Sequence, residues 1–390
     1  MAVDHAERQD RHANDGGKRH DDSTGGTTVR GCRLCTGRAK CTGGDIAILQ
    51  VDMANAPGST AASPFRIAVL AYDGCLGLQV FGLVDLLRMA ADVGRSLGHP
   101  PRRALAVEIC SVGGGPVTLA GGATIATRRL RGRPHLLVVP GFDPSGAAEP
   151  ALCLPQRARE ARAIQRVFAG GAAVASICTG AFLLGSAGLL DGRAVTTSWM
   201  FGGHLARAFP AAVVRTDALL LEDSGVTTTG AVSAALDLAV QLIKQHFGAA
   251  VASATANVSL LPGVRSDQRP FVDARLSAAQ TGSFAARVSD WFGGRLGERY
   301  ELARVAAAFK VSPRTLMRRV KAESGQSPLA LLQQLRVEEA KRLLAGSGAS
   351  IERVTEAVGY ADPVTFARLF ARVVGESPAR YRRRMGLAPT

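Results

Sequence analysis

The feature that most constrains this chain is an internal repeat near its C-terminal end. Residues 302–320 are echoed by residues 351–370, with Val305 matching Val354 at an offset of 49 and Arg318 matching Arg368 at an offset of 50. The offset of 50 also joins Pro313 to Pro363, Thr315 to Thr365, Gly325 to Gly375, Ser327 to Ser377 and Pro328 to Pro378. One supersecondary unit is therefore present twice, and the extra residue of the second copy falls in a turn.

Each copy predicts a helix, a short turn and a second helix. In the first copy, Leu302, Val305 and Phe309 repeat at the spacing of one helix face. Ser312 then suits the N-cap of a new helix, and a proline follows it in the first turn. Asp362 holds the same place in the second copy and is also followed by proline. The repeat therefore predicts two helix-turn-helix units.

The second helix of each copy has an outward face that is mostly polar and basic. Leu316 and Val320 are four residues apart and are expected to face inward. A short helix with arginine at its centre fits the major groove of DNA, where arginine can donate two hydrogen bonds to guanine. A helical bundle with a basic solvated face is the alternative, which explains the duplication less well. The predicted DNA-binding residues are Ser312, Arg314, Thr315, Met317, Arg318, Lys321, Val364, Thr365, Arg368 and Arg372.

On these motifs, residues 290–386 resemble the DNA-binding domain of the AraC/XylS family of transcriptional regulators. In that family a linker helix joins two helix-turn-helix units, and residues 328–344 fit this helix. Residues 375–384, with the sequence GESPARYRRR, are similar to the closing signature of the family. The resemblance implies two recognition helices that enter successive major-groove segments on one face of the duplex. Lys310 stands where the first turn often has glycine, so some strain is expected there.

The distribution of charge agrees with this interpretation. The chain has 390 residues and a net charge of +15, and residues 271–390 alone have 20 basic and 11 acidic residues, a net charge of +9. A surface that binds phosphates needs such an excess. No run of about twenty apolar residues is present, and the N-terminus lacks the apolar core of a signal peptide. We therefore expect a cytoplasmic protein that has no membrane contact.

The N-terminal 63 residues are polar and lack apolar periodicity, which predicts a disordered extension. They contain Cys32, Cys35 and Cys41, with His20 upstream. A zinc site favours four ligands at paired spacing, and this spacing does not provide them. We therefore predict no metal site and assign the extension no function.

Residues 64–264 alternate apolar strands with helices. We expect strands at residues 65–71, 107–112, 136–139, 172–177, 213–221 and 225–229. We expect helices at residues 80–91, 158–168, 180–187 and 231–247, whereas residues 251–271 have the composition of a linker. This alternation predicts an α/β domain with a parallel sheet covered on both faces.

Cys178 is the chemical focus of this domain. A buried strand runs directly into a helix there, which leaves the thiol on a sharp turn in the crevice at the carboxyl end of the strand. The helix N-terminus is expected to favour the thiolate. Gly141 ends another strand, where backbone amides suit a carboxylate or an oxyanion.

This stretch is similar to the nucleophile elbow of the DJ-1/PfpI and class I glutamine amidotransferase-like superfamily, and the resemblance covers residues 66–264. It implies a flavodoxin-like fold and places Asp85 beside the cysteine. Enzymes of the superfamily commonly have histidine after the cysteine, where this chain has Thr179, and histidine in a later segment, where it has Ser198. His135, His204 and His246 lie in no motif that points at Cys178. A cysteine nucleophile needs a base, so we expect a sensor pocket with no catalytic residue and no cofactor, lined by Asp85, Gly141, Cys178, Thr179 and Ser198.

The expected organisation is an extension at residues 1–63, a sensor domain at 64–264, a linker and the start of a helix at 265–284, and an all-α double helix-turn-helix domain at 285–386. This arrangement resembles the GlxA-like regulators, which implies a dimeric sensor that controls transcription in response to a metabolite. Two functions stay open. The first is a ligand-responsive factor on promoter DNA, most often an activator that works with RNA polymerase. The second is a cysteine-dependent amidase, hydrolase or glyoxalase-type enzyme that also binds DNA. An amino acid, a quaternary amine or a small carboxylate would each suit the pocket.

Overall fold

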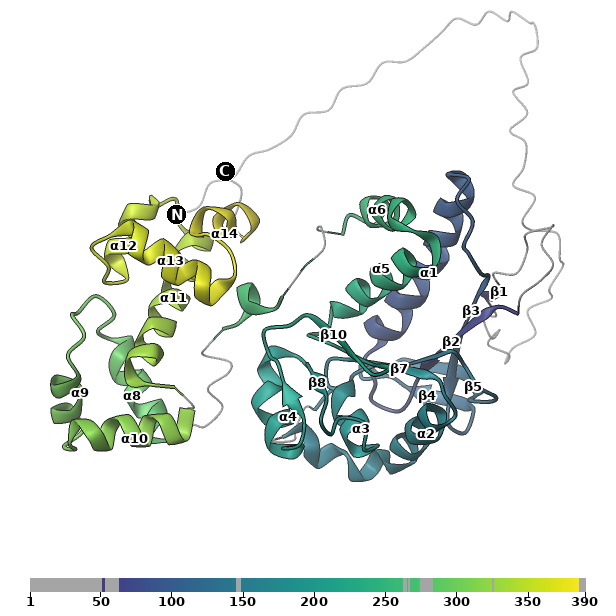
Figure 1. Ribbon diagram of the computed structural model, residues 1–390, viewed down its shortest axis with the longest axis horizontal. Coiled ribbons are helices and arrows are strands. Elements are labelled where there is room, and N and C mark those ends of the chain that lie inside the picture. Colours follow the sequence, from purple (N-terminus) through teal and green to yellow (C-terminus); the bar gives the residue numbers. More distant parts are fainter. Residues whose placement is uncertain are drawn as a thin grey trace, which may run out of the picture. The chain divides into compact units, whose positions relative to one another are not determined.

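The computed structural model describes residues 63–144, 149–261, 265, 267–273, 283–324 and 326–385, together with the two-residue strand β1 (Val51–Asp52). Cys32, Cys35 and Cys41 lie outside the described residues. The described residues from 63 onward form a sheet domain and a C-terminal region of helices (Figure 1).

The sheet domain is built on one mixed sheet with the strand order β10-β11-β7-β6-β2-β3-β5-β4. Neighbouring strands from β11 to β5 pair in parallel, and the edge strands β10 and β4 pair antiparallel. The strands are β2 (Phe65–Leu70), β3 (Leu105–Ser111), β4 (Gly115–Thr118), β5 (Thr124–Arg129), β6 (Leu136–Val139), β7 (Ala173–Ile177), β10 (Leu220–Asp223) and β11 (Val226–Thr229). The central strands β6 and β2 are almost wholly buried, as a parallel sheet covered on both faces requires. The predicted fold class is confirmed.

The prediction of one strand over residues 213–221 is wrong. Strand β9 (Val213–Val214) ends early and pairs with β8 (Ala194–Val195), and β10 starts only at Leu220. Between them, Ala218 forms an isolated bridge with Asp267, which belongs to the segment that leaves the domain. The chain therefore changes its pairing partner at the polar residues Arg215, Thr216 and Asp217, in the middle of the predicted strand.

Strand β1 was not expected in the N-terminal extension. Val51 and Asp52 pair antiparallel with Val107 and Ala106 of β3. The strand on that side of β3, β5, pairs only with Cys110 and Ser111, so the first half of β3 has an open edge. An open strand edge readily accepts another strand, and β1 covers it.

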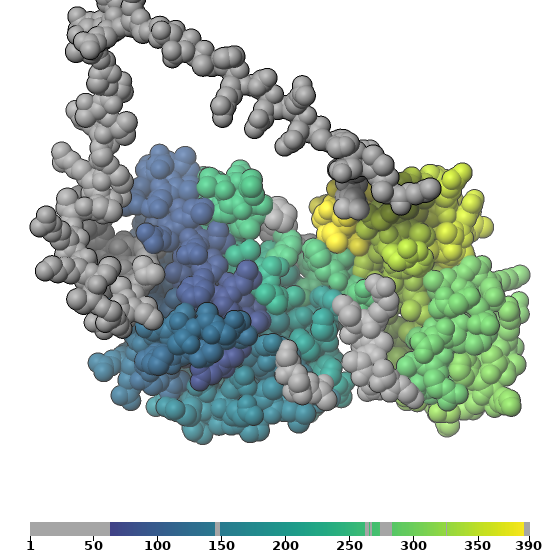
Figure 2. Space-filling view, turned by 180° about the vertical axis from the view of Figure 1, so that it is seen from behind, coloured from purple at the N-terminus to yellow at the C-terminus, as the bar shows by residue number. Residues whose placement is uncertain are grey.

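Helices cover both faces of the sheet (Figure 1). One face carries α1 (Gly77–Ser96), α5 (Ala234–Phe247) and α6 (Ala249–Val258), and the other carries α2 (Ala158–Ala169), α3 (Gly180–Ser186) and α4 (Gly202–Ala208). Short 3₁₀ turns are η1 (Pro150–Cys153), η2 (Pro155–Arg157) and η3 (Trp199–Phe201). Helix α6 lies beside α1 and α5 (Figures 1 and 2), so the prediction that the linker starts at residue 251 is wrong. Gly248, at φ 94°, turns the chain from α5 into α6, and Val251 is buried.

The C-terminal region is all helical. It contains α8 (Phe284–Gly293), α9 (Leu302–Ala308), α10 (Pro313–Ser324), α11 (Pro328–Gly346), α12 (Ile351–Ala357), α13 (Pro363–Val374) and α14 (Pro378–Met385), and η4 (Arg269–Phe271) precedes them. The linker helix predicted at residues 328–344 is α11. Helix α8 is capped by Ser283, whose hydroxyl accepts from Ala286 N at 3.0 Å. Within the range 265–284, where the start of a helix was expected, residues 274–282 lie outside the described residues.

Two separate apolar cores hold these helices. The first contains Phe284, Val288 and Phe292 of α8, packed with residues of α9, α10 and α11. The second contains Phe366, Phe370 and Tyr381, packed with residues of α11 and α12. Helix α11 contributes to both. Within the described part of the chain, no helix is both long and apolar enough to cross a membrane.

Candidate nucleic-acid interface and sensor site

Helices α9 and α10 form the first helix-turn-helix unit, and α12 and α13 form the second. The two turns have the same geometry, since Val311 N donates to Ala306 O at 3.1 Å and Tyr360 N donates to Thr355 O at 3.0 Å. Just before these residues, Lys310 and Gly359 adopt left-handed backbone conformations at φ 55° and 79°. A left-handed residue at this place closes a helix end, and glycine adopts that conformation most easily. The strain expected at Lys310 is therefore present.

The capping residues lie where the sequence predicted them. Ser312 Oγ accepts from Thr315 N at 3.1 Å. The Asp362 carboxylate accepts from Val364 N at 3.1 Å and from Thr365 N at 2.9 Å. Hydrogen bonds from the Thr365 hydroxyl and then from these backbone groups hold the pKa of Asp362 below its usual value. Both recognition helices therefore begin with a satisfied N-terminus.

Helices α10 and α13 each pack one face into an apolar core and leave the opposite face outside it. On the inward face, Leu316 and Val320 of α10 and Phe366 and Phe370 of α13 are fully buried. Thr315 is half-buried beside Ser312. The other predicted DNA-binding residues, Ser312, Arg314, Met317, Arg318, Lys321, Val364, Thr365, Arg368 and Arg372, are exposed. The structure thus presents on each recognition helix the side chains that the sequence selected.

Arg336 is a residue that the sequence analysis missed. It is only 7% exposed, and its guanidinium donates to Leu296 O at 2.8 Å and to Glu298 O at 2.6 Å, just before the first unit. The same guanidinium lies 5.1 Å from the ring centre of Tyr360, in the turn of the second unit. It belongs to α11, so one side chain joins both units. Its partners are backbone carbonyls, which leave no motif in the sequence.

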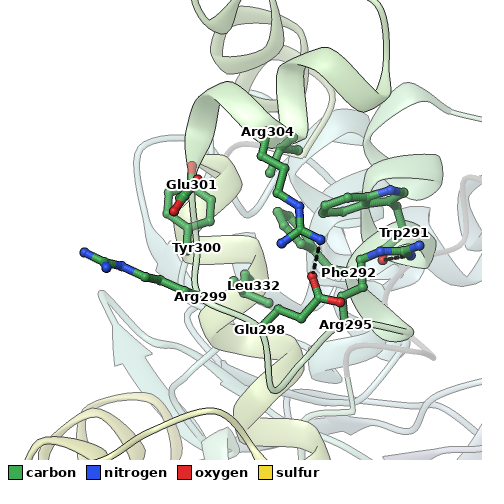
Figure 3. A pocket seen from close by; sticks show the side chains of 10 residues that line it. Trp291, Phe292, Arg295, Glu298, Arg299, Tyr300, Glu301, Arg304 and Leu332 are labelled. Atoms are coloured by element: carbon green, nitrogen blue, oxygen red, sulfur yellow. Dashed lines mark hydrogen bonds and ion pairs between the residues drawn. The ribbon is translucent and has the colours of Figure 1, made fainter.

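A shallow hollow between α8, α9 and α11 is lined by charged and aromatic side chains (Figure 3). Arg304 forms an ion pair with Glu298 at 2.7 Å, and the Arg295 guanidinium lies 4.7 Å from the ring centre of Trp291. Both guanidinium groups are therefore engaged by side chains of α8 and of the segment between α8 and α9. We therefore assign the hollow to packing and not to a ligand.

In the sheet domain, Cys178 lies on a sharp turn between β7 and α3. Its φ of 54° is left-handed, a strained conformation for a residue with a side chain. Its N–H donates to Thr229 O at 3.2 Å, and its carbonyl accepts from the Thr197 hydroxyl at 2.7 Å. The strand, turn and helix of the predicted elbow are present.

The elbow packs closely on the end of β6. A Cβ on Gly141 would lie 2.7 Å from Thr179 Oγ1, and a Cβ on Gly180 would lie 2.5 Å from Val139 O. The Thr179 hydroxyl accepts from Phe142 N at 2.8 Å and donates to Phe142 O at 2.7 Å. The N–H of Ser198 faces the Cys178 thiol. Gly141, Cys178, Thr179 and Ser198 are therefore brought together as predicted.

Asp85 does not join them. Its side chain is exposed on α1, whereas Gln79, six residues earlier, is fully buried. Gln79 Oε1 accepts from Gly141 N at 2.5 Å, and Gln79 Nε2 donates to Val232 O at 3.4 Å. Six residues are about 9 Å of helix and about one and two-thirds turns, which sets the two side chains roughly 120° apart around the helix axis. The prediction that Asp85 lies beside Cys178 is therefore wrong. The neutral carboxamide of Gln79, from an earlier turn of α1, binds Gly141 N where an acid was expected.

The Cys178 thiol is protonated at neutral pH. It is 4% exposed, and burial raises its pKa to about 11, although N–H groups of Thr179 and Ser198 and the Thr179 hydroxyl lower the pKa. Helix α3 has only 7 residues, so its dipole gives little help. The expectation that the helix favours a thiolate is therefore wrong here, because desolvation outweighs it.

The three histidines that the sequence left open lie elsewhere. His135 accepts from Arg66 N at 3.0 Å and stacks on Phe65, and His246 also packs on Phe65. Phe65 begins β2, whereas Cys178 follows the end of β7, which runs parallel to the other central strands. His135 and His246 therefore lie at the amino ends of the strands, and Cys178 lies at their carboxyl ends. His204 lies 3.5 Å from Glu149. None of the three faces the thiol as a base would.

Comparison with known proteins agrees with both halves of this description. A helix-turn-helix domain model matches residues 305–384, and the DJ-1/PfpI family model matches residues 66–245. The HTH-type transcriptional regulator GlxA of Rhizobium meliloti is 30% identical over 236 residues, which are 57% of this chain and 69% of that protein. The chain belongs to the AraC-type helix-turn-helix transcriptional regulators with a DJ-1/PfpI domain.

Other relatives share parts or all of this architecture. The HTH-type transcriptional regulator CdhR of Pseudomonas aeruginosa is 26% identical over 283 residues, 70% of this chain and 81% of that protein. A solved AraC family transcriptional regulator from Pseudomonas putida is 19% identical and covers 50% of this chain and 100% of its own, with a TM-score of 0.39. The family recognised from the sequence is confirmed, and the protein is a DNA-binding transcriptional regulator.

Proposed function

We propose that this regulator reads promoter DNA through α10 and α13, and that its DJ-1/PfpI domain binds a small effector without converting it. In this proposal the protein is a cytoplasmic homodimer that activates transcription with RNA polymerase when the effector is bound. The observation that carries the sensor role is the state of Cys178, a buried thiol with a raised pKa and no facing base. A thiol in that state is a poor nucleophile.

The surroundings of Cys178 favour an effector with a carboxylate or an amide group. Gly141 N already binds the oxygen of the Gln79 carboxamide, which marks it as a donor for such a group. An effector that binds there would replace this oxygen with its own. A quaternary amine would need an acid or an aromatic cage, and Asp85 lies outside.

The DNA-binding part is tested by footprinting on the region upstream of the gene. We expect protection of two segments about one helical turn apart on one face of the duplex. Protection should weaken steeply with salt, because phosphate contacts release counterions. A lack of sequence-selective protection at modest salt would contradict the proposal. A transcription assay on the same fragment then distinguishes activation from repression.

An enzyme remains the second candidate because the elbow geometry around Cys178 is intact. With a pKa of about 11, the thiolate fraction should rise about tenfold for each pH unit from 7 to 10. Alkylation of Cys178 by iodoacetamide should follow this rise, whereas a catalytic thiolate would react at neutral pH. Cys178→Ala should retain regulated transcription. If that variant instead loses both an amidase activity and regulation, the enzyme hypothesis is favoured.

A further inference from the structure

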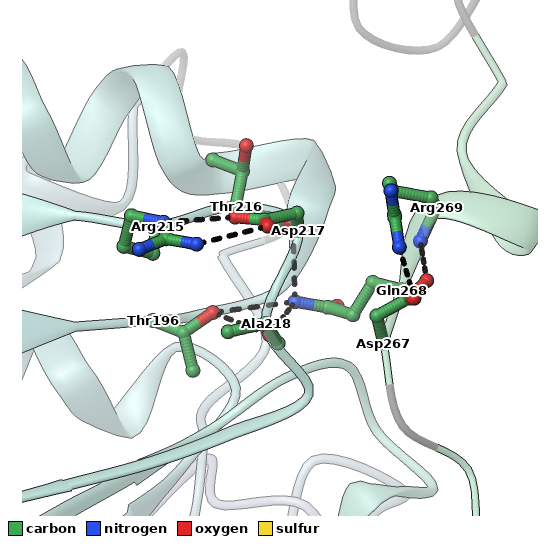
Figure 4. A network of polar contacts seen from close by, with 8 residues as sticks. All are labelled: Thr196, Arg215, Thr216, Asp217, Ala218, Asp267, Gln268 and Arg269. Carbon is green, nitrogen blue, oxygen red and sulfur yellow. Dashed lines mark hydrogen bonds and ion pairs between the residues drawn. The ribbon is translucent and has the colours of Figure 1, made fainter. Parts of the chain in front are cut away.

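We propose that Gln268 is a latch that couples the loop beside Cys178 to the segment connecting the sensor and DNA-binding domains. This inference rests on the proposed sensor function and names the route by which the sensor domain acts. Gln268 lies in the segment that leaves the sheet domain, yet it is only 2% exposed. Its carboxamide is inserted among three segments of that domain. Figure 4 shows it between two of them, at Thr196 and at Ala218.

Both ends of the Gln268 carboxamide are hydrogen-bonded. Oε1 accepts from Trp199 N and from Ala231 N, each at 3.2 Å. Nε2 donates to Thr197 O at 2.8 Å and to Ala218 O at 3.0 Å. It also lies 3.3 Å from Thr196 Oγ1 and from Thr216 O. The backbone is fixed as well, because Gln268 N donates to Asp217 O at 2.7 Å.

The sheet domain is shaped to receive this side chain. A Cβ on Gly230 would lie 2.5 Å from Gln268 Cδ, so the space for the carboxamide exists only because residue 230 is glycine. Asp267 pairs with Ala218 as an isolated bridge and binds Arg269, which holds the backbone on either side of Gln268 (Figure 4). The connecting segment is therefore anchored to the sheet domain at Gln268 by a site that fits this carboxamide.

The loop that Gln268 binds is also the loop that touches the elbow. We define the elbow loop as residues 196–199. Its Thr197 hydroxyl donates to Cys178 O at 2.7 Å, and its Ser198 N–H faces the Cys178 thiol. Thr197 O and Trp199 N of the same loop bind Gln268. The elbow loop therefore has Cys178 on one side and the connecting segment on the other.

Coupling follows from this shared loop. An effector that accepts a hydrogen bond from the Ser198 N–H, or that displaces Thr197, moves the elbow loop. It thereby changes the hydrogen bonds of Thr197 O and Trp199 N with the Gln268 carboxamide. Linkage is reciprocal, so release of Gln268 must also loosen the elbow. The effector thus shifts the connecting segment between a latched and a released population.

The reactivity of Cys178 tests the latch without knowledge of the effector. In Gln268→Glu the side chain keeps its size but faces the acceptor oxygens of Thr197 and Ala218 with a carboxylate that cannot donate. We expect methyl methanethiosulfonate to label Cys178 in the full chain about tenfold faster or more. Gln245→Ala changes an exposed glutamine on α5 and should label like the wild type.

A second variant reaches the latch without changing Gln268. Gly230→Ala places a methyl group against the carboxamide, whereas Gly121→Ala adds one into open space. Only the first should accelerate labelling. Cys110 serves as the internal control, because it is fully buried in β3 and should react faster only if the domain as a whole unfolds. Labelling is read by peptide mass spectrometry, which resolves the two thiols.

The outcomes separate the latch from the proposed function. A rise at Cys178 with Cys110 unchanged supports the latch, and equal rises at both thiols, or none, overturn it. On the footprinted fragment, Gln268→Glu should also change the Kd of the full chain about threefold or more at an unchanged salt dependence. An unchanged Kd would overturn the coupling to the DNA-binding domain. If the wild type protects no DNA, the proposed function fails, whatever the labelling shows.

Discussion

The two helix-turn-helix units have the same plan and differ in how their turns meet the rest of the region. Lys310 and Gly359 occupy equivalent left-handed positions. The Lys310 side chain is exposed, whereas a Cβ on Gly359 would lie 2.5 Å from Leu296 O and 2.7 Å from Arg336 Nη2. The turn alone therefore tolerates a side chain, and it is the surroundings of the second turn that require glycine.

The recognition surfaces also differ. The first unit exposes Arg314, Arg318 and Lys321, together with Met317, which is 48% exposed. The second unit exposes Arg368 and Arg372 beside Val364, which is 56% exposed. The first unit thus has more cations for phosphates, and the second combines arginine with an apolar contact that suits a thymine methyl group.

The largest contrast is expected at the two turns. Gly359→Ala should destabilise the second unit by about 3 kcal/mol, because the methyl group meets a backbone carbonyl and the left-handed conformation disfavours it. Lys310→Gly should stabilise the first unit by at most about 1 kcal/mol, since relief of strain is offset by the entropy of glycine. Urea-dependent hydrogen exchange in α13 and α10 measures the two separately. Equal losses for Lys310→Ala and Gly359→Ala would contradict the comparison.

The arginines at the centres of the recognition helices come next. Arg318→Ala and Arg368→Ala should each reduce discrimination between the best site and a single-base variant by about 1–3 kcal/mol. Fluorescence anisotropy on a panel of variant sites measures the discrimination. Arg342 on α11 is also exposed but pairs with Glu339, so Arg342→Ala is the matched control. A loss that is uniform over all sequences would make that arginine a phosphate contact.

A smaller effect is expected at Val364. If Val364 contacts a thymine methyl group, replacing that thymine with uracil should weaken wild-type binding by about 0.8 kcal/mol, the free energy of one buried methyl group. In Val364→Ala the difference in binding free energy between the thymine DNA and the uracil DNA should be smaller than in the wild type. Met317→Ala with the corresponding uracil scan over the first half-site is the parallel test. The same uracil penalty in Val364→Ala and in the wild type would exclude this contact.

The smallest contrast is between the two N-caps. The pKa of Asp362 is depressed in the folded state, so its stabilising contribution is present above the unfolded value of about 4 and is lost as the pH falls through the folded value. The Ser312 cap does not titrate in this range. The protection factors of the amides in the first turn of α13 should therefore fall on acidification in the wild type and not in Asp362→Ser, while those in the first turn of α10 change little in either protein. A parallel fall of the protection factors in α10 would refute the assignment.

The sequence predicted the elements whose signal is local. Repeated spacing, caps and apolar runs located both helix-turn-helix units and the central strands correctly. Helix α6 was missed because its sequence of mostly alanine, valine, serine and threonine has no strong periodicity. Strand β1 was missed because what fixes it is the open edge of β3, more than 50 residues further along the chain.

The site could be predicted only where a motif names its residues. Cys178, Thr179, Gly141 and Ser198 meet as expected, because each lies at the end of a strand or on the loop beside it. Asp85 was misplaced because the spacing of a motif does not show which turn of a helix faces a distant glycine. Gln268 and Arg336 were missed because their partners are mainly backbone groups from remote segments.

The position of Arg336 has a consequence for the choice of target DNA. One guanidinium binds the carbonyls before the first unit and packs on the aromatic ring in the turn of the second unit. The spacing between the two helix-turn-helix units is therefore held fixed. An extra base pair between the half-sites rotates the far one by roughly 34° and shifts it by about 3.4 Å. A jointed protein would follow that displacement. We expect this one to lose affinity for such a site, so the gap between half-sites should be as much a part of the operator as the bases themselves.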